Sequence, residues 1–242
     1  MSGIRPRAAL LATLALACVA LAALLAPAVF AQTQDAPLSP AAERVFTYWK
    51  DRYEAARTVA AVHPAASPLE ELDRRVGVEQ AGRIALSEVL DAGLGRDDLD
   101  AVQQRIWSIL GEADADNTAF LKSILPEQGW FRISVEGLAA SQSAWLIAQH
   151  SPDEAFRAEA LKRMTPLLES NDVERSQYAL IFDRVQMNAG KPQRYGSQAM
   201  CVDHVLAFHD IEDRANVDAR RAEMGLGPLK DYGERLGVGE PC

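Results

Sequence analysis

The chain has 242 residues, and its 25 Lys and Arg against 34 Asp and Glu give a formal net charge of −9. Nucleic-acid binding needs clustered basic side chains, and this acidic balance argues against it. Apolar residues make up 48% of the chain, which is enough to build a buried core. We therefore expect an acidic globular body with no nucleic-acid partner.

The first 31 residues have the order of a secretory signal peptide. Arg5 and Arg7 form a basic start, an uncharged apolar run follows, and Val29 and Ala31 supply the small or branched residues of a cleavage site. This order predicts cleavage after Ala31 and a periplasmic or secreted protein with no remaining membrane segment. The apolar run is also long enough to span a bilayer, so a retained N-terminal membrane anchor is the alternative. Cleavage changes the formal charge from −9 to −11, because the leader carries two arginines and no acidic residue.

Helical spacing of apolar residues begins after a polar, proline-containing linker over residues 32–40. Helix-start patterns recur along the chain, for example Ser67-Pro68 followed by Glu70. The Asx-rich segment 114–117 is interpreted as a helix end with a cap at Asp116 or Asn117, in preference to a calcium loop. The helices are expected over residues 41–62, 67–92, 97–117, around 120–124, 134–150, 151–170, 172–190 and 213–236, the last with a stop at Met224-Gly225.

The apolar pattern changes after Pro192. Residues 194–211 contain β-type residues in partial alternation, which predicts a small β-hairpin near 194–209. The expected fold is therefore mainly α, a single helical domain of about seven or eight helices with this hairpin. Cleavage of the leader would leave two cysteines, Cys201 and Cys242, which in an exported protein are a disulfide candidate. Two free thiols are the alternative.

The common signatures of nucleotide, zinc and serine-hydrolase sites are absent from the sequence. His204 and His209 lie five residues apart, which on a strand places them on opposite faces. We therefore expect no metal site and no cofactor.

His150 lies at the joint between two strongly predicted helices, directly after Gln149. Helix N-termini favour anions, so these two side chains are candidates for binding a carboxylate or phosphate group. The alternative is structural: His150 ends one helix and hydrogen-bonds the turn to the next.

Asp183 and Arg184 form a charged pair inside an apolar helical stretch. Charges in such surroundings are costly unless they are paired, so the two side chains must have a specific role. Asp183 is a candidate general acid or base if it lines a pocket, and the alternative is that the pair anchors neighbouring loops. Further candidates for holding a polar ligand are Gln193, Tyr195 and Gln198 in the polar segment "KPQRYGSQ".

Several short motifs follow one another in order along the chain: "GW" at 129–130, "QH" at 149–150, "DR" at 183–184, "QRYGSQ" at 193–198 and "RRAEMGLGPL" at 220–229. In this order they resemble the bacterial domain-of-unknown-function family numbered 6624. The similarity covers residues 114–232, and departures are Phe131, where the family often has proline, and Ser197, where it often has threonine. The resemblance implies a mostly helical, often exported domain, without an agreed activity. It favours residues 41–110 as an N-terminal helical extension and 111–242 as the family-like domain.

Two functions remain open at this point. The first is an exported binding or interaction module for a small polar or anionic ligand or an envelope component, with no membrane contact after signal cleavage. The second is an unrecognised hydrolase-type enzyme. It would use His150 and Asp183 in a pocket with Arg184, Tyr195 and Gln198.

Overall fold

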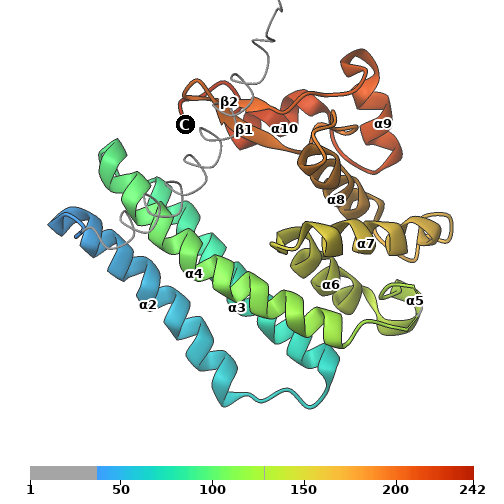
Figure 1. Cartoon of the computed structure of the whole chain (residues 1–242), viewed down its shortest axis with the longest axis horizontal. Coiled ribbons are helices and arrows are strands. Elements are labelled where there is room, and N and C mark those ends of the chain that lie inside the picture. Colours follow the sequence, from blue (N-terminus) through green and yellow to red (C-terminus); the bar gives the residue numbers. More distant parts are fainter. Residues whose placement is uncertain (1–36, 128) are drawn as a thin grey trace, which may run out of the picture. The chain divides into compact units, whose positions relative to one another are not determined.

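The computed structural model describes residues 37–127 and 129–242, and the predicted leader over residues 1–31 lies outside these ranges. Within them the chain forms nine α-helices, two 3₁₀ helices and one two-stranded antiparallel sheet (Figure 1). The mainly α fold with a small hairpin is therefore confirmed, with one or two helices more than predicted. None of the described helices combines the length and apolar character needed to cross a membrane.

Three long helices come first: α2 (Pro40–Val62), α3 (Pro68–Leu90) and α4 (Arg96–Ser123). The start of α3 follows the predicted capping pattern. Ser67 Oγ accepts a hydrogen bond from Glu70 N at 3.2 Å, and Glu70 Oε2 accepts one from Ala66 N at 2.7 Å. These contacts satisfy backbone N–H groups that a helix start leaves without a partner.

Helix α4 is longer than predicted, because the Asx-rich segment does not end it. Asp116 Oδ2 accepts a hydrogen bond from Arg75 Nη1 at 2.6 Å, and Asn117 Oδ1 accepts one from the same atom at 3.2 Å. The polar side chains that suggested a cap thus contact another helix, and no glycine or proline interrupts α4 between Gly111 and its end. The predicted cap at Asp116 or Asn117 and the separate helix around 120–124 are wrong.

Four helices follow: α5 (Ile133–Glu136), α6 (Leu138–His150), α7 (Glu154–Met164) and α8 (Arg175–Asn188). Helices α6, α7 and α8 pack against one another (Figure 1). The predicted helix over 134–150 is interrupted at Gly137, whose φ of 88° lies outside the helical region. The helix predicted to start at residue 151 starts later, because the Asp153 side chain caps it by accepting from Phe156 N at 2.9 Å.

The hairpin consists of β1 (Ala199–Val202) and β2 (Val205–Phe208), paired antiparallel within the predicted range. Asp203 and His204 form the two-residue turn, with φ angles of 50° and 66°. Two positive φ angles are what a type I′ turn requires, and this turn matches the twist of the strands that it joins. The 3₁₀ helices are Thr165–Leu167 and Arg214–Asn216.

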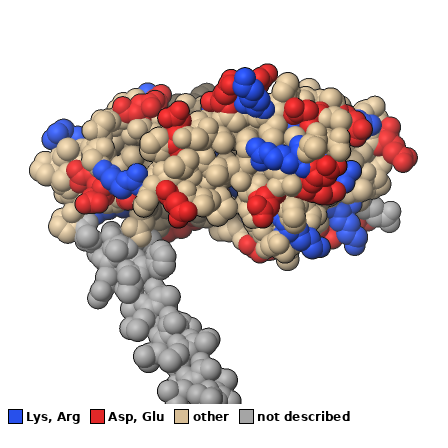
Figure 2. All heavy atoms as spheres, turned by 90° about the horizontal axis from the view of Figure 1, so that it is seen from above, with Lys and Arg blue, Asp and Glu red and all other residues tan. Residues whose placement is uncertain are grey.

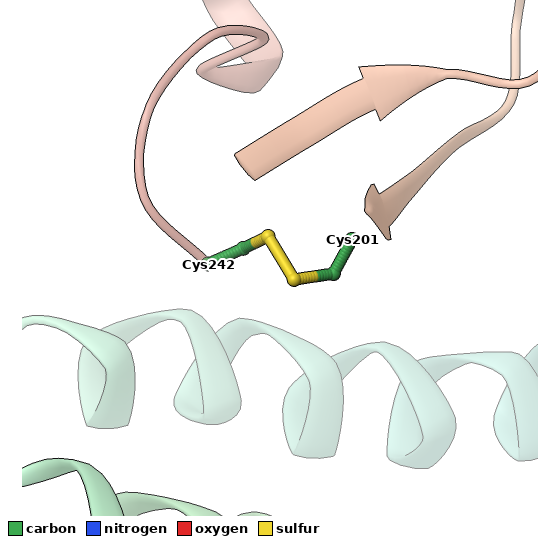
Figure 3. Close-up of a disulfide and its surroundings, with 2 residues drawn as sticks. All are labelled: Cys201 and Cys242. Atoms are coloured by element: carbon green, nitrogen blue, oxygen red, sulfur yellow. A yellow bond between two sulfur atoms is a disulfide. The ribbon is translucent and has the colours of Figure 1, made fainter. Parts of the chain in front are cut away.

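The chain ends with α9 (Val217–Glu223), α10 (Leu229–Leu236) and a short C-terminal segment. Cys242 in this segment forms a disulfide with Cys201 on β1, with 5.8 Å between the two Cα atoms (Figure 3). The end of the chain is therefore linked covalently to the hairpin.

The described chain divides into two compact units. The first consists of the described part of Met1–Asp51 together with Ile84–Ile109, and the second consists of Arg52–Arg83 together with Leu110–Cys242. Residues 52–83 group with the C-terminal part in this division, apart from residues 84–109. The main hydrophobic core belongs to the second unit, and its large side chains at 2% exposure or less include Trp130, Phe131, Leu72, Leu121, Ile147, Met164 and Ile181. All residues of the site described next belong to this second unit.

Candidate functional site

Asp183 anchors the segment "KPQRYGSQ", which follows α8. Its side chain is fully buried, and its Oδ1 accepts hydrogen bonds from Arg194 N at 2.7 Å and Tyr195 N at 3.0 Å. Its Oδ2 accepts from Ser197 N at 2.9 Å. Burial raises the pKa of the Asp183 carboxyl, while these backbone hydrogen bonds oppose that effect. Both carboxylate oxygens are thus engaged by backbone, which favours the loop-anchoring interpretation of Asp183.

Gln193 and Tyr195 also have structural surroundings. The Gln193 amide donates from Nε2 to Gln198 O at 2.9 Å and to His209 O at 2.7 Å, and its Oε1 accepts from Gln198 N at 2.8 Å. Tyr195 is 7% exposed, and its ring meets Phe182 edge-on with 5.7 Å between the centroids. Neither side chain is directed to a ligand-accessible surface by these contacts.

Gly196 is required by the shape of this loop. Its φ is 66°, a value that favours glycine, and a Cβ at this position would lie 2.6 Å from Leu229 Cδ1. The glycine therefore lets the loop pass close to α10. The same loop positions Gln198 against Arg184.

Gln198 connects the loop to Arg184. Its Oε1 accepts a hydrogen bond from Arg184 Nε at 3.1 Å, and its Nε2 donates to Ser197 Oγ at 3.0 Å. The Arg184 guanidinium forms no ion pair with any carboxylate of the described residues. The loop thus positions an arginine without neutralising it.

Arg157 on α7 is a second arginine that forms no ion pair with a carboxylate of the described residues. It is 6% exposed, and its Nη2 donates to Ser151 O at the α6–α7 joint. Its Nε has no hydrogen-bond partner among the described residues. Burial lowers the pKa of Arg157, and the charges of Glu154 and Asp153 only partly oppose this.

The two arginines influence each other electrostatically. Burial lowers the pKa of Arg184, and the positive charges of Arg157 and Arg83 lower it further. The two guanidinium groups repel each other, and partial removal from water strengthens this repulsion, which raises the free energy of the ligand-free protein. A bound anion would relieve this repulsion.

His150 is held by a buried carboxylate from α3. His150 Nδ1 contacts Glu79 Oε1, and the Glu79 side chain is 1% exposed whereas that of His150 is 20% exposed. Arg83, one turn further along α3, places its Nη1 3.2 Å from the same Glu79 oxygen. Arg83 Nη2 also donates to Asp114 Oδ2 on α4 at 2.8 Å. Burial raises the pKa of the Asp114 carboxyl, and the hydrogen bond from Arg83 opposes that shift.

Several buried polar atoms of this network lack a hydrogen-bond partner among the described residues. They are Glu79 Oε2, Asp114 Oδ1 and Arg157 Nε, and Gln149 Oε1, next to His150 in the chain, also lacks one. Arg83 Nη1 makes no hydrogen bond either, although it lies 3.2 Å from Glu79 Oε1 as an ion-pair contact. Buried polar groups in folded proteins are nearly always satisfied by protein, water or ligand, so a concentration of exceptions marks a polar site. These residues come from four helices, α3, α4, α6 and α7.

The charge of the network is opposite in sign to that of the whole protein. Arg83, Arg157 and Arg184 contribute three positive charges, and Glu79 and Asp114 contribute two negative ones, in a chain of formal charge −9. The face of the protein seen in Figure 2 shows acidic and basic side chains interspersed, without a large patch of one sign. Guanidinium groups are suited to binding carboxylate or phosphate.

The structure therefore divides the residues that the sequence singled out. His150, Arg184 and Gln198 belong to the polar network or contact it, Gln149 is buried next to His150 in the chain, and Asp183, Gln193 and Tyr195 build the adjoining loop. Sequence reasoning missed four residues: Glu79, Arg83, Asp114 and Arg157. A weak signal existed in the i,i+4 spacing of Glu79 and Arg83 on one helix face, but this spacing does not reveal His150 as their partner.

Comparison with known proteins gives one family match. A model described as "Family of unknown function (DUF6624)" matches residues 78–238. The match begins at the turn of α3 that carries Glu79, so it includes every residue of the polar network. Neither a curated protein nor a solved structure matches the chain significantly.

Proposed function

The chain belongs to the DUF6624 family, for which no function is known, and we propose that it is an exported protein that binds a small anion through a phosphate or carboxylate group. The ligand would contact Arg157 and Arg184, with His150 beside them. The observation that carries this proposal is that Arg157 is buried, Arg184 is half-buried, and neither forms an ion pair with a described carboxylate.

The energetics of buried charge support this proposal. An arginine stays protonated at ordinary pH, so it cannot avoid the cost of burial by losing its proton. An ion removed from water costs several kcal/mol unless a partner compensates. A structural arginine normally has a carboxylate or a set of carbonyl partners, as Arg221 does with Tyr195 O at 2.7 Å and Gly227 O at 2.6 Å. Arg157 has one such partner and Arg184 has one side-chain amide.

Export is proposed from the sequence of the leader. A protein released after Ala31 would meet its ligand outside the cytoplasm, where small phosphorylated or carboxylated compounds and envelope fragments are available. The acidic composition supports a ligand of small size in preference to a nucleic acid.

A thermal-shift titration with inorganic phosphate and with malonate tests the proposal. At a ligand concentration of about 100 times Kd the stabilisation is about 2.7 kcal/mol, which raises Tm by roughly 5–10 °C for a chain of this size. Arg157→Met and Arg184→Met should each weaken binding about tenfold or more, since each removes a charged hydrogen-bond donor.

Arg175→Met is the matched control, because Arg175 is exposed and, in the part of the chain that the structure describes, its side chain hydrogen-bonds Asn171 Oδ1 and Leu168 O. It should leave the anion-induced shift unchanged. The proposal fails if neither anion raises Tm, or if the shift is the same in the Arg157→Met/Arg184→Met double variant as in the wild type.

A further inference from the structure

We propose that the site hydrolyses phosphate monoesters, with His150 as the general base toward water and Glu79 as the positioning residue that orients it. The phosphate group of the ester would be held by Arg157 and Arg184, so this inference rests on the anion site proposed above. It replaces Asp183, the partner that the sequence suggested for His150, with a residue from α3.

The first argument is the orientation of the imidazole ring. Glu79 Oε1 contacts Nδ1 of His150, and a carboxylate at this nitrogen favours the tautomer with the proton on Nδ1. The other nitrogen, Nε2, then carries the lone pair that can accept a proton. The side chain of His150 is 20% exposed, so water can reach the ring, whereas the Glu79 side chain is buried at 1% exposure.

The second argument is that the orienting carboxylate is itself held in place. Arg83 Nη1 lies 3.2 Å from Glu79 Oε1, and Asp114 Oδ2 accepts from Arg83 Nη2 at 2.8 Å. A base, an orienting acid and a group that fixes the acid are the arrangement expected of a proton-transfer site. Arg157 donates to the carbonyl of Ser151, which directly follows His150, so a buried arginine with no ion pair to a described carboxylate lies beside this pair.

The third argument is the charge of the anion site, which suits a phosphate monoester. Two guanidinium groups without a carboxylate partner match the two negative charges of a monoester, and a carboxylate or a diester supplies only one. Phosphoryl transfer also develops charge on the phosphate oxygens and the leaving oxygen, and fixed arginines stabilise such charge.

The reaction needs only the ester and water. His150 Nε2 takes a proton from water as the water oxygen bonds to phosphorus. The bond between phosphorus and the ester oxygen breaks, and its electron pair goes to that oxygen. The resulting alkoxide takes the proton from the His150 imidazolium, so the products are an alcohol and inorganic phosphate and His150 returns to its neutral form.

The experiment measures p-nitrophenol release from p-nitrophenyl phosphate and bis(p-nitrophenyl) phosphate, in parallel with phosphate binding by calorimetry. The wild-type protein should hydrolyse the monoester, and His150→Gln should lower kcat about 100-fold or more. Glu79→Gln should lower kcat and alter the pH profile, because an amide does not fix the same tautomer. His63→Gln is the matched control, since His63 is an exposed histidine whose Nδ1 lies 3.0 Å from Val59 O.

The outcomes separate the two proposals. Phosphate binding without monoester hydrolysis overturns the hydrolytic inference and leaves the binding proposal standing, and the absence of phosphate binding overturns both. Hydrolysis of the diester alone overturns the assignment to monoesters. Full activity in His150→Gln overturns the role of His150.

If His150→Gln does not fold, the wild-type pH profile still decides. The rate must fall as the pH is lowered, because a protonated imidazole cannot accept a proton. A rate that is flat on the acidic side would exclude a histidine base.

Discussion

Replacing Asp183 by alanine tests whether this residue is an anchor or a ligand-binding group. The change removes the acceptor of three backbone N–H groups, those of Arg194, Tyr195 and Ser197. A buried donor left without a partner costs about 1–3 kcal/mol, so three of them predict a loss of about 3–6 kcal/mol after some relaxation of the loop. This is a large part of the roughly 5–15 kcal/mol that stabilises a typical domain.

Urea denaturation of Asp183→Ala, with Asp231→Ala as the control, measures this loss. Asp231 is an exposed aspartate on α10 in the same unit, so its removal should change the free energy of unfolding by no more than about 0.5 kcal/mol. Asp183→Asn should fall between the two, because the amide keeps one acceptor oxygen but turns an NH₂ group toward a backbone donor. A loss below about 1 kcal/mol in Asp183→Ala would refute the anchoring role.

Three further predictions concern the same unit. Gly196→Ala should destabilise the protein by about 2–4 kcal/mol, since it adds a crowded Cβ near Leu229 to a left-handed φ. Gly225→Ala is its control, with a similar φ of 69° but no atom within 4 Å of the added Cβ, and should cost only about 1–2 kcal/mol in thermal denaturation. Removing the Cys201–Cys242 disulfide by Cys242→Ser should lower the free energy of unfolding by about 4 kcal/mol, from the loop entropy of a 41-residue separation. An unfolding midpoint of Cys242→Ser equal to that of the wild type without dithiothreitol would contradict this. The pKa of Asp114 is raised in the folded state, so its contribution to stability is fully present below the unfolded-state pKa and is lost as the pH rises through the folded-state pKa. The free energy of unfolding of the wild type relative to Asp114→Asn should therefore decrease as the pH rises above about 4. An increase over that range in urea denaturation would contradict this.

The sequence predicted the elements whose signals are local. The capping pattern at Ser67 and Glu70 marks the start of α3, and the change of residue type after Pro192 locates the hairpin. The wrong prediction at residues 114–117 has the opposite cause. Asp116 and Asn117 resemble a local cap, but their partner is Arg75, about 40 positions earlier in the chain. Local propensity was overridden there by a tertiary contact.

Only part of the polar site could be predicted from the sequence, because its contacts also join residues that are far apart in the chain. His150 stood out because it occupies a joint between two helices, but its partner Glu79 is 71 positions away. Glu79 and Arg83 read as an ordinary i,i+4 pair of a solvated helix face, and only packing shows that this face is buried. A charged residue on an amphipathic helix gives no sign in the sequence of whether it faces water or another charge.

The loop after α8, residues 191–198, contributes to the site by positioning Arg184. Asp183 and Gln193 fix the backbone from Arg194 to Gln198, and this leaves the Gln198 amide placed to accept from Arg184. Arg184 is therefore held by a neutral group that directs it without cancelling its charge. If a carboxylate formed an ion pair with Arg184 instead, the folded protein would be more stable, but the guanidinium would be less able to bind an anion. The polar residues of "KPQRYGSQ" thus act on the proposed ligand indirectly, through the position of one guanidinium, while the chemistry is assigned to side chains of α3, α6 and α7.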